Sequence, residues 1–331
     1  MALRAVLIGC GNIGSAFADD PRITDIYTHA GAWSACADVE LAAVCDANAE
    51  RAQRCARRWQ VAAHFTDVGQ MLDRVRPELV SICTPDATHA AILAQVLATP
   101  GVRGVLAEKP LALSCMDGRT LVAQAEARGI VVAVNYSRRY ARGQRQLAQR
   151  VRDGLLGELR QIRGCYTKGT LHNGTHWIDW ARMFAGEIAA VRGFDALGEN
   201  GDDPTLDARL EFAGGAVGTL TALDHRDYSL FEIDLLGSRG RLRIFDSGHR
   251  FQLDLAGDSP RYSGYRALLE QESGEVDMRD TLLLAAGDLL TAVAQRRPPL
   301  CSAADALETL AVAEAARLSA KRGGLAVAVG R

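Results

Sequence analysis

The first half of the chain alternates short apolar runs with amphipathic segments. The apolar runs are rich in β-branched residues and end in glycine, proline or a polar residue, which is typical of buried parallel strands. We expect strands at 3–8, 39–46, 62–65, 78–84, 104–108 and 130–135. Helical periodicity falls between them, at 49–59, 67–75, 90–98 and 117–129. Regular alternation of this kind predicts an α/β domain with a doubly wound parallel sheet.

In the second half, from Glu158 on, apolar and polar residues alternate with a period of two. In the run FEIDLL, Phe231, Ile233 and Leu235 point to one face of a half-exposed strand. Turn residues at 214–215 and 238–240 predict antiparallel hairpins. Two closing helices are expected, at 280–295 and 303–321. The pattern predicts an α+β domain with a large open, mostly antiparallel sheet and helices on one face.

A glycine-rich run, GCGNIG, follows the first predicted strand, and a helix-like segment follows it. The run places Gly9, Gly11 and Gly14 in G-x-G-x-x-G order, which lets a backbone approach a pyrophosphate at a helix N-terminus. Asp46 ends the second strand, where a carboxylate accepts hydrogen bonds from a ribose diol. Asp46 lies 46 − 14 = 32 positions after Gly14, instead of about 20. We therefore expect an insertion within residues 19–27, DDPRITDIY.

Polar residues also follow three further strands of the predicted sheet. They are Thr84-Pro85, Glu108-Lys109-Pro110 and Asn135. Ligands bind at the carboxyl ends of the strands in such sheets. These residues are therefore candidates for the same site as the glycine-rich run.

The order of these motifs resembles that of the glucose-fructose oxidoreductase, inositol dehydrogenase and MocA family of nicotinamide-dependent sugar and polyol dehydrogenases. The resemblance spans almost the whole chain and is carried by GCGNIG, Cys45-Asp46, TPDATH at 84–89, EKP at 108–110 and NYSRRY at 135–140. It implies an N-terminal dinucleotide-binding Rossmann domain at 1–137. It also implies a C-terminal α+β domain at 138–331 for substrate binding and oligomerisation.

The resemblance implies NAD as the cofactor. The residues implied in cofactor binding are Gly9, Gly11, Asn12, Ile13, Gly14, Asp46, Thr84, Pro85, His89, Glu108, Lys109 and Asn135. Lys109 would also reach the substrate hydroxyl beside the nicotinamide, and Pro110 would fix the loop through a cis peptide bond. Asp46 would repel a 2′-phosphate, which makes NADP the less favoured cofactor, although Arg51 and Arg54 lie nearby.

The segment LHNGTHWIDW, residues 171–180, leaves three interpretations open. His172, His176 and Asp179 have the spacing of one helix face, which suits a metal site. Alternatively, the segment is only a structural helix with its aromatic residues packed inward. The third interpretation is a site for proton transfer. Because Asn173-Gly174 interrupts the helical register and Thr175 is a good N-cap, we expect the helix to begin near His176, with His172 on a loop.

Proton transfer is the favoured interpretation, because an imidazole at a helix N-terminus stays able to accept a proton. The resemblance assigns this role to His176 within a D-x-x-x-H spacing. His172 stands where the family has the aspartate, so it would bind the sugar or orient His176. The catalytic candidates are Lys109, His176 and His172, the substrate-binding candidates are Asp179, Asn173, Arg139 and Tyr166, and no metal is expected.

Charge and cysteine content restrict the partners. The formal net charge is −2 and no basic stripe is present, so neither nucleic acid nor a membrane is expected as a partner. The eight cysteines are scattered without a C-x-x-C pair, and the N-terminus leaves no room for a signal peptide; both favour a cytoplasmic location. The expected partners are a small sugar or polyol and further copies of the chain, as a homodimer or homotetramer built through the C-terminal sheet.

The sequence thus predicts an enzyme that moves a hydride between the nicotinamide and a secondary hydroxyl or ketone of a sugar, sugar derivative or cyclitol. Carbohydrate biosynthesis is the expected setting. Two other functions stay open. Similar chains act as glycosidases that use NAD only for a transient oxidation, and a non-enzymatic redox sensor could bind NAD(P) on the same fold.

Overall fold

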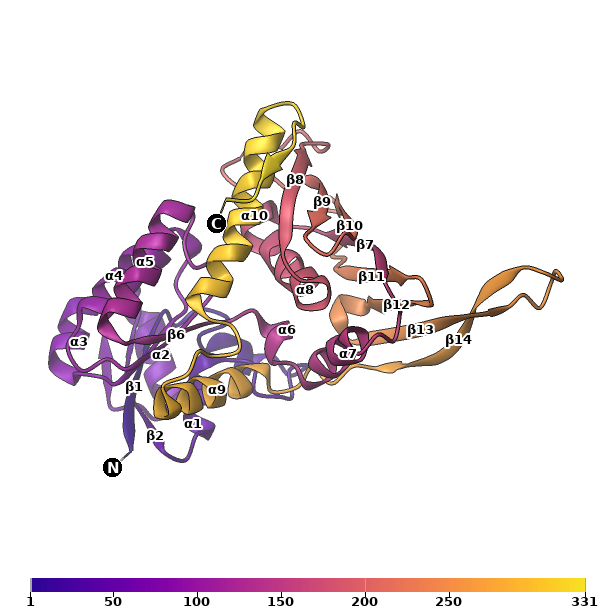
Figure 1. Ribbon diagram of the computed structural model, residues 1–331. Helices are drawn as coiled ribbons and strands as arrows, with labels where there is room; N and C mark the ends of the chain where they lie inside the picture. Colours follow the sequence, from indigo (N-terminus) through magenta and orange to yellow (C-terminus); the bar gives the residue numbers. More distant parts are fainter. Residues whose placement is uncertain (1, 200, 331) are drawn as a thin grey trace. The chain divides into compact units, whose positions relative to one another are not determined.

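The computed structural model describes residues 2–199 and 201–330, and these form two compact units (Figure 1). Unit 1 contains the residues up to Ala141 together with Arg279–Leu307. Unit 2 contains Arg142–Met278 and the residues from Glu308 on. Within the described ranges, none of the helices is both long enough and apolar enough to span a bilayer.

Unit 1 is built on a six-stranded parallel sheet in the order β3-β2-β1-β4-β5-β6. Its strands are β1 Leu3–Ile8, β2 Val39–Cys45, β3 Ala63–Phe65, β4 Leu79–Ile82, β5 Gly104–Ala107 and β6 Val131–Val134. Its helices are α1 His29–Ala35, α2 Ala49–Trp59, α3 Val68–Val75, α4 His89–Ala98, α5 Cys115–Arg128, α6 Ser137–Tyr140, α9 Thr281–Gln295 and the start of α10 Ala303–Lys321. The chain order reverses between β1 and β4, so their carboxyl ends form the switch point where doubly wound sheets bind ligands.

The helix after the glycine-rich run is interrupted by an insertion. The N–H groups of His29 and Ala30 donate to the carbonyl oxygens of Ile13 and Gly14, both at 3.0 Å. In an uninterrupted helix, residues 17 and 18 would make these bonds, so 29 − 17 = 12 residues are inserted. Removing them leaves 32 − 12 = 20 positions between Gly14 and Asp46, the spacing expected of a dinucleotide-binding unit. The predicted insertion is confirmed; only a short 3-10 helix, Ala16–Asp19, follows the glycines directly, and α1 begins at His29.

Helix α9 belongs to unit 1, although the sequence placed everything after residue 137 in the second domain. A Cβ atom on Gly104 of β5 would lie 2.9 Å from the side chain of Val293, so α9 packs directly on the sheet. Farther along, the N–H of Val134 donates to the carbonyl of Cys301 at 2.9 Å. The chain thus returns to the first unit after the second sheet, which no local pattern signals.

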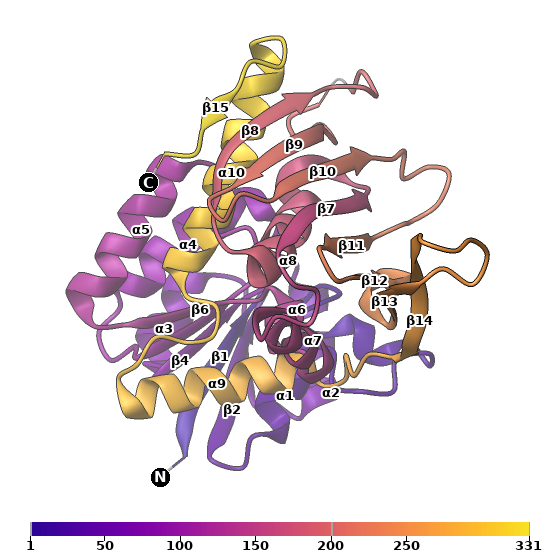
Figure 2. The same ribbon diagram turned by 45° about the vertical axis from the view of Figure 1, so that its right-hand side comes forward.

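Unit 2 contains a nine-stranded sheet in the order β14-β13-β12-β11-β7-β10-β9-β8-β15 (Figure 2). Its strands are β7 Leu159–Tyr166, β8 Ile188–Phe194, β9 Asp207–Phe212, β10 Val217–Ala222, β11 Glu232–Gly237, β12 Gly240–Phe245, β13 Arg250–Asp258, β14 Arg266–Glu275 and β15 Val327–Ala328. All described neighbours pair antiparallel except β10 with β7. The predicted mostly antiparallel sheet is confirmed, including the hairpins that turn at 214–215 and 238–239.

Helices cover one face of this sheet. They are α7 Arg142–Arg152, α8 Thr175–Ala185 and most of α10. Glycines permit the close approach: a Cβ on Gly164 of β7 would collide with Trp177 of α8, and one on Gly193 of β8 with the backbone of α10 at Ala316. On the other face the strands carry accessible polar residues, among them Arg163 and Thr219. The second sheet therefore has one covered face and one open, polar face.

Candidate active site

The glycine-rich turn has the shape of a dinucleotide cradle. A Cβ on Gly9 would collide with the backbone of Cys83, and one on Gly14 with the carbonyl of Gly9, so both positions need glycine for packing. Gly9 also has a φ of +96°, which side chains rarely adopt. By contrast, a Cβ on Gly11 would meet no atom within 4 Å. The open space over Gly11 is where a pyrophosphate would approach the backbone, so this turn fits a dinucleotide.

Asp46 is tied to the glycine-rich turn. Its Oδ2 accepts the N–H of Cys10 at 2.9 Å, and its Oδ1 accepts the N–H of Asn48 at 2.8 Å and the Nη2 of Arg51 at 3.0 Å. Burial alone would raise the pKa of Asp46, but the hydrogen bonds from Arg51, Asn48 and Cys10 outweigh it and lower the pKa. Asp46 is therefore held as a carboxylate, as acceptance of ribose hydroxyls requires.

Lys109 lies in a buried loop directly after β5. Its residue is 9% exposed, and the Lys109–Pro110 peptide bond is cis, as the resemblance implied. The preceding residue, Glu108, is also buried, and its Oε1 accepts the Nδ2 of Asn135 at 2.6 Å. This hydrogen bond joins the carboxyl ends of β5 and β6 beside Lys109. Glu108 and Asn135 therefore lie together, as expected for residues that follow strands of one parallel sheet.

Glu108 also accepts a hydrogen bond from His29, which lies on α1. The distance from His29 Nε2 to Glu108 Oε1 is 3.0 Å. Burial would raise the pKa of Glu108, but the hydrogen bond from His29, the charge of Lys109 and the hydrogen bond from Asn135 lower it overall. The sequence analysis missed His29, because the insertion hides its place in the first turn of the helix; the N-cap Thr28 was the available signal.

Residues of the TPDATH segment differ in whether a cofactor could reach their side chains. Thr84 is half-buried and Pro85 is exposed at the carboxyl end of β4, as expected for cofactor contacts. His89, however, is only 2% exposed, and its ring nitrogens lie 2.7 Å from the carbonyl oxygens of Pro110 and Thr84. The predicted cofactor contact of His89 is therefore not supported, since both polar atoms of its ring are engaged inside the protein.

In unit 2, the segment before α8 is helical instead of a loop. Residues Gly169–Gly174 form a π-helix that runs into α8 without a break. Thr175 is not an N-cap: its hydroxyl donates to the carbonyl of Leu171 at 2.7 Å. His172 is exposed on this turn, and His176 is half-buried on α8. Helix α8 begins at Thr175, so the predicted helix start near His176 is confirmed, but the π-helix continues the helical backbone before it, and His176 therefore does not lie at a free helix end.

The π-helix forms because a distant loop satisfies its first N–H groups. The carboxylate of Asp203 accepts the N–H of Leu171 at 2.7 Å and that of His172 at 2.8 Å. The hydroxyl of Thr205 accepts the N–H of Gly169 at 2.9 Å. π-helices are frequent at functional sites. The loop from 203 to 205 thus holds the turn that carries His172, and no local sequence pattern signals this contact.

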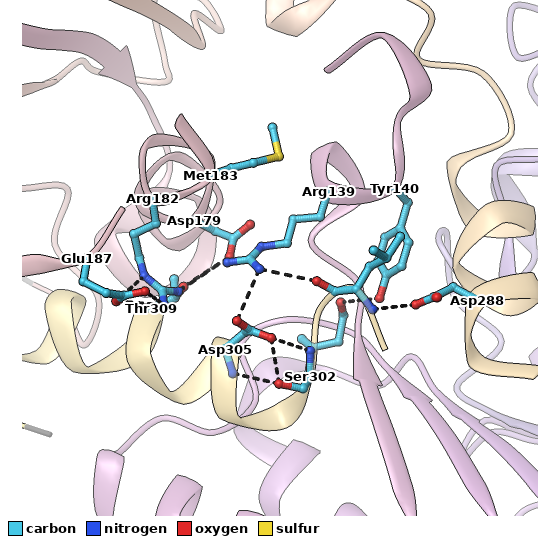
Figure 3. Close-up of polar contacts among 12 residues, drawn as sticks. Arg139, Tyr140, Asp179, Arg182, Met183, Glu187, Asp288, Ser302, Asp305 and Thr309 are labelled. Carbon is cyan, nitrogen blue, oxygen red and sulfur yellow. Dashed lines mark hydrogen bonds and ion pairs between the residues drawn. The ribbon is translucent and has the colours of Figure 1, made fainter. Parts of the chain in front are cut away.

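Two other predicted substrate ligands lie in polar networks, shown in Figure 3. Asp179 is 1% exposed, accepts a hydrogen bond from Thr309 at 3.3 Å and lies 3.9 Å from Arg182. Within unit 1, Arg139 pairs with Asp305 at 3.3 Å. Asp179 thus links α8 to α10. Asn173 is half-buried, and its Nδ2 donates to the carbonyl of Thr167 at 2.9 Å.

Tyr166 has a structural role instead of the predicted contact with substrate. It is 0% exposed, and its hydroxyl contacts Thr170 at 3.0 Å, donates to the carbonyl of Leu206 at 2.9 Å and accepts the N–H of Leu206 at 2.8 Å. Burial raises its pKa well above the usual value. The phenol therefore joins β7, the π-helix and the 203–206 loop, and no polar atom of it is left for a ligand.

Replacing Tyr166 by Phe is expected to destabilise unit 2 by about 1–3 kcal/mol, because buried partners of the hydroxyl lose a hydrogen bond. Thermal unfolding of the two proteins measures the change. If Tyr166 bound substrate instead, the Phe variant would unfold like the parent and show a raised KM.

The metal interpretation of LHNGTHWIDW can be tested directly. In the described part of the chain, no group of three or more histidine, cysteine, aspartate or glutamate side chains is arranged to hold a metal ion. We expect elemental analysis to find no stoichiometric zinc or iron, and chelation to leave turnover unchanged. Loss of activity on chelation would instead assign His172 and His176 to a metal.

The fold and the cradle define an oxidoreductase that uses a nicotinamide adenine dinucleotide. Residues 3–136 match the oxidoreductase family with an NAD-binding Rossmann fold, and residues 166–243 match the GFO/IDH/MocA C-terminal domain. The chain belongs to the Gfo/Idh/MocA family. Its cofactor is NAD, and it acts on CH–OH groups as a dehydrogenase or reductase.

Characterised relatives are dehydrogenases of sugars and cyclitols. The D-glucoside 3-dehydrogenase of Escherichia coli K12 is 26% identical over 73% of this chain and 77% of its own. The myo-inositol 2-dehydrogenase of Thermotoga maritima is 23% identical over 96% of both chains. The solved structure of a levoglucosan dehydrogenase with NADH and L-sorbose matches with a TM-score of 0.81 over 100% of both chains at 22% identity, a likeness that shows the fold.

Proposed function

We propose that this protein oxidises a secondary hydroxyl of a sugar, sugar derivative or cyclitol with NAD, or reduces the corresponding ketone. The observation that carries the proposal is the buried Lys109 loop at the carboxyl end of β5, along the same edge of the sheet as the glycine-rich cradle that follows β1. The substrates named for the relatives support the substrate class. When bound, NAD supplies the hydride acceptor.

Lys109 is assigned to the reacting oxygen. A buried ammonium group beside the carbinol oxygen stabilises the negative charge that develops on it as the proton leaves. Asp46, paired with Arg51, would accept hydrogen bonds from the adenosine ribose, and the N–H groups around Gly11 would hold the pyrophosphate. These residues orient the cofactor, while Lys109 acts on the substrate.

His176 is assigned as the base that takes the carbinol proton, and returns it in the reverse reaction. His172 is assigned to a substrate hydroxyl, in the position that holds an aspartate in the family. A cationic or neutral imidazole in place of a carboxylate changes the hydrogen bonds offered to the sugar, so we propose a substrate other than an inositol.

A substrate screen tests the proposal. Polyols, hexoses and nucleotide sugars are incubated with NAD or NADP, and the nicotinamide absorbance is followed. Accumulation of NADH with one compound supports the dehydrogenase. Release of an aglycone without net NADH would identify a glycosidase, whereas tight NADH binding without turnover of any compound would favour a redox sensor.

We expect NAD(H) to bind at least tenfold more tightly than NADP(H), a difference of about 1.4 kcal/mol. A 2′-phosphate would meet the carboxylate of Asp46, whose nearest cation, Arg51, is already paired. Fluorescence titration with NADH and NADPH measures the preference. Replacing Asp46 by Ser should reduce it, and equal affinities in the unchanged protein would remove Asp46 from its assigned role.

We further propose a homodimer or homotetramer that pairs through the open face of the second sheet. The accessible side chains of that face, such as Arg163 and Thr219, support this because the sheet's other face is already covered by helices. Light scattering after size exclusion gives the mass.

A cytoplasmic location is also proposed, supported by eight free thiols, Cys10 to Cys301, and cell fractionation tests it.

A further inference from the structure

Two buried histidines contact the loop of Lys109, one at each end. His29 binds the residue before Lys109, and His89 binds the residue after it. Their residues are 0% and 2% exposed, and neither ring has a polar atom left for a ligand. Their contacts all lie within unit 1. The proposed chemistry uses neither histidine, so their burial beside Lys109 needs its own explanation.

The hydrogen-bond partners of the His29 ring determine which of its nitrogens donates. Its Nδ1 lies 2.9 Å from the hydroxyl of Ser81, and that hydroxyl accepts the indole N–H of Trp33 at 2.7 Å. Because the carboxylate of Glu108 can only accept, the proton must be on Nε2 of His29, and Nε2 donates to Glu108. The hydroxyl proton of Ser81 is then available to Nδ1. The chain of donors runs from α1 through His29 to the start of the Lys109 loop.

The His89 ring has a different requirement. Both of its nitrogens face carbonyl oxygens at 2.7 Å, that of Pro110 from Nδ1 and that of Thr84 from Nε2. Carbonyl oxygens only accept, so both bonds form only when both nitrogens carry a proton. His89 also begins helix α4, whose N-terminal end disfavours a positive charge. Two carbonyl acceptors would offset this for a ring that carries both protons.

We propose that His29 and His89 are positioning residues that fix Lys109 from the two ends of its loop, and that His89 does so as an imidazolium. His29 anchors Glu108 to the helix that continues the glycine-rich turn. His89 joins Pro110 to the carboxyl end of β4. The proposal rests on the role proposed for Lys109 and adds two residues that act through it without touching the substrate.

The physical consequence concerns geometry. An ammonium group on a four-carbon side chain has many rotamers, and a displacement of about 1 Å at a reacting group can cost on the order of 10²-fold in rate. The loop backbone sets where the Lys109 side chain starts. When both neighbouring residues are held, the backbone of Lys109 can move less. Hydrogen bonds of the Lys109 side chain alone would not restrict the backbone in this way.

The first test uses the unchanged protein with ¹⁵N-labelled histidine. Of the seven histidines, His89 should show two protonated ring nitrogens near neutral pH, and His29 should show one protonated Nε2. Variants assign the signals. A single protonated nitrogen on His89 would overturn the imidazolium, and a His29 proton on Nδ1 alone would overturn the bond to Glu108.

The second test reads Lys109 itself. The chain has only three lysines, and Lys168 and Lys321 are exposed, so protein labelled with [ε-¹³C]lysine should give three signals that Lys168→Arg and Lys321→Arg assign. His29→Leu and His89→Leu should each shift or broaden the Lys109 signal. His64→Leu, at an exposed position of β3, is the matched control and should leave it unchanged.

The Gln variants separate positioning from folding. His29→Gln keeps a donor toward Glu108, so its Lys109 signal should lie closer to that of the parent than the signal of His29→Leu. If a Leu variant does not fold, the Gln variant at the same position serves as the test and should still perturb Lys109. Unchanged Lys109 signals in the folded variants of both histidines would overturn the proposal.

Kinetics provides the final measurement. With a substrate from the screen, His29→Leu and His89→Leu should lower kcat about tenfold or more while the Kd for NADH stays within about twofold. An unchanged kcat would overturn the positioning role. The NMR measurements do not require a substrate. Failure to find a substrate in the screen can therefore be distinguished from failure of the positioning proposal.

Discussion

Replacing Lys109 by Ala reduces turnover by on the order of 10²-fold or more, because the buried ammonium group no longer stabilises the charge on the substrate oxygen. Binding of NADH is expected to stay nearly unchanged, since we propose that Asp46 and the turn around Gly11 hold the ribose and the pyrophosphate. Steady-state kinetics and fluorescence titration of NADH measure the two effects separately. The variant should therefore bind NADH like the parent while it turns over substrate far more slowly.

The matched control for this prediction is Lys321→Ala, at an exposed position of helix α10. It should match the parent in kcat and in NADH affinity. If Lys109→Ala instead loses NADH affinity in proportion to turnover, Lys109 binds the cofactor and does not act on the substrate. Circular dichroism and thermal unfolding establish that the variant is folded.

Replacing His176 by Ala is expected to reduce kcat by a similar factor, on the order of 10²-fold, and to remove the limb of the pH profile that reports the base. His172→Ala should mainly raise KM, because His172 is assigned only to a substrate hydroxyl. The pH dependence of kcat/KM for both variants distinguishes the two histidines. The comparison is well matched, since His172 and His176 lie on one continuous helical segment.

The opposite result would reassign the base. Should His172→Ala remove the pH limb while His176→Ala keeps it, the exposed histidine of the π-helix is the base, and His176 holds the sugar. Retention of the limb in both variants would leave neither histidine as the base.

Most of the fold was predictable from local patterns. The apolar, β-branched runs marked the parallel strands, because a strand covered on both faces has no polar side. The turn residues Gly214-Gly215 and Ser238-Arg239-Gly240 marked two hairpins of the second sheet for an equally local reason. The return of α9 to unit 1 was not predictable, since its packing on Gly104 depends on a partner 189 positions away in sequence (293 − 104).

The candidate site was predictable where it follows strand ends. Asp46, Glu108 and Asn135 were found because the carboxyl ends of parallel strands lie along one edge of the sheet. The π-helix was missed, because Asn173-Gly174 locally favours a break and the satisfying carboxylate of Asp203 lies in another loop. Tyr166 was misassigned because burial and saturation of a hydroxyl are invisible without the packed structure.

The twelve-residue insertion after Gly14 could be removed or exchanged without a change in the rest of the fold. The residues after the insertion resume the helical hydrogen bonds to the glycine-rich turn, so a chain that joins residue 16 directly to His29 could continue the helix with His29 and Ala30 still donating to Ile13 and Gly14. The added chain costs little free energy, since closure entropy grows only slowly with loop length. Evolution, or a protein engineer, can therefore exchange this segment for another of different length or chemistry without redesigning the nucleotide cradle beneath it.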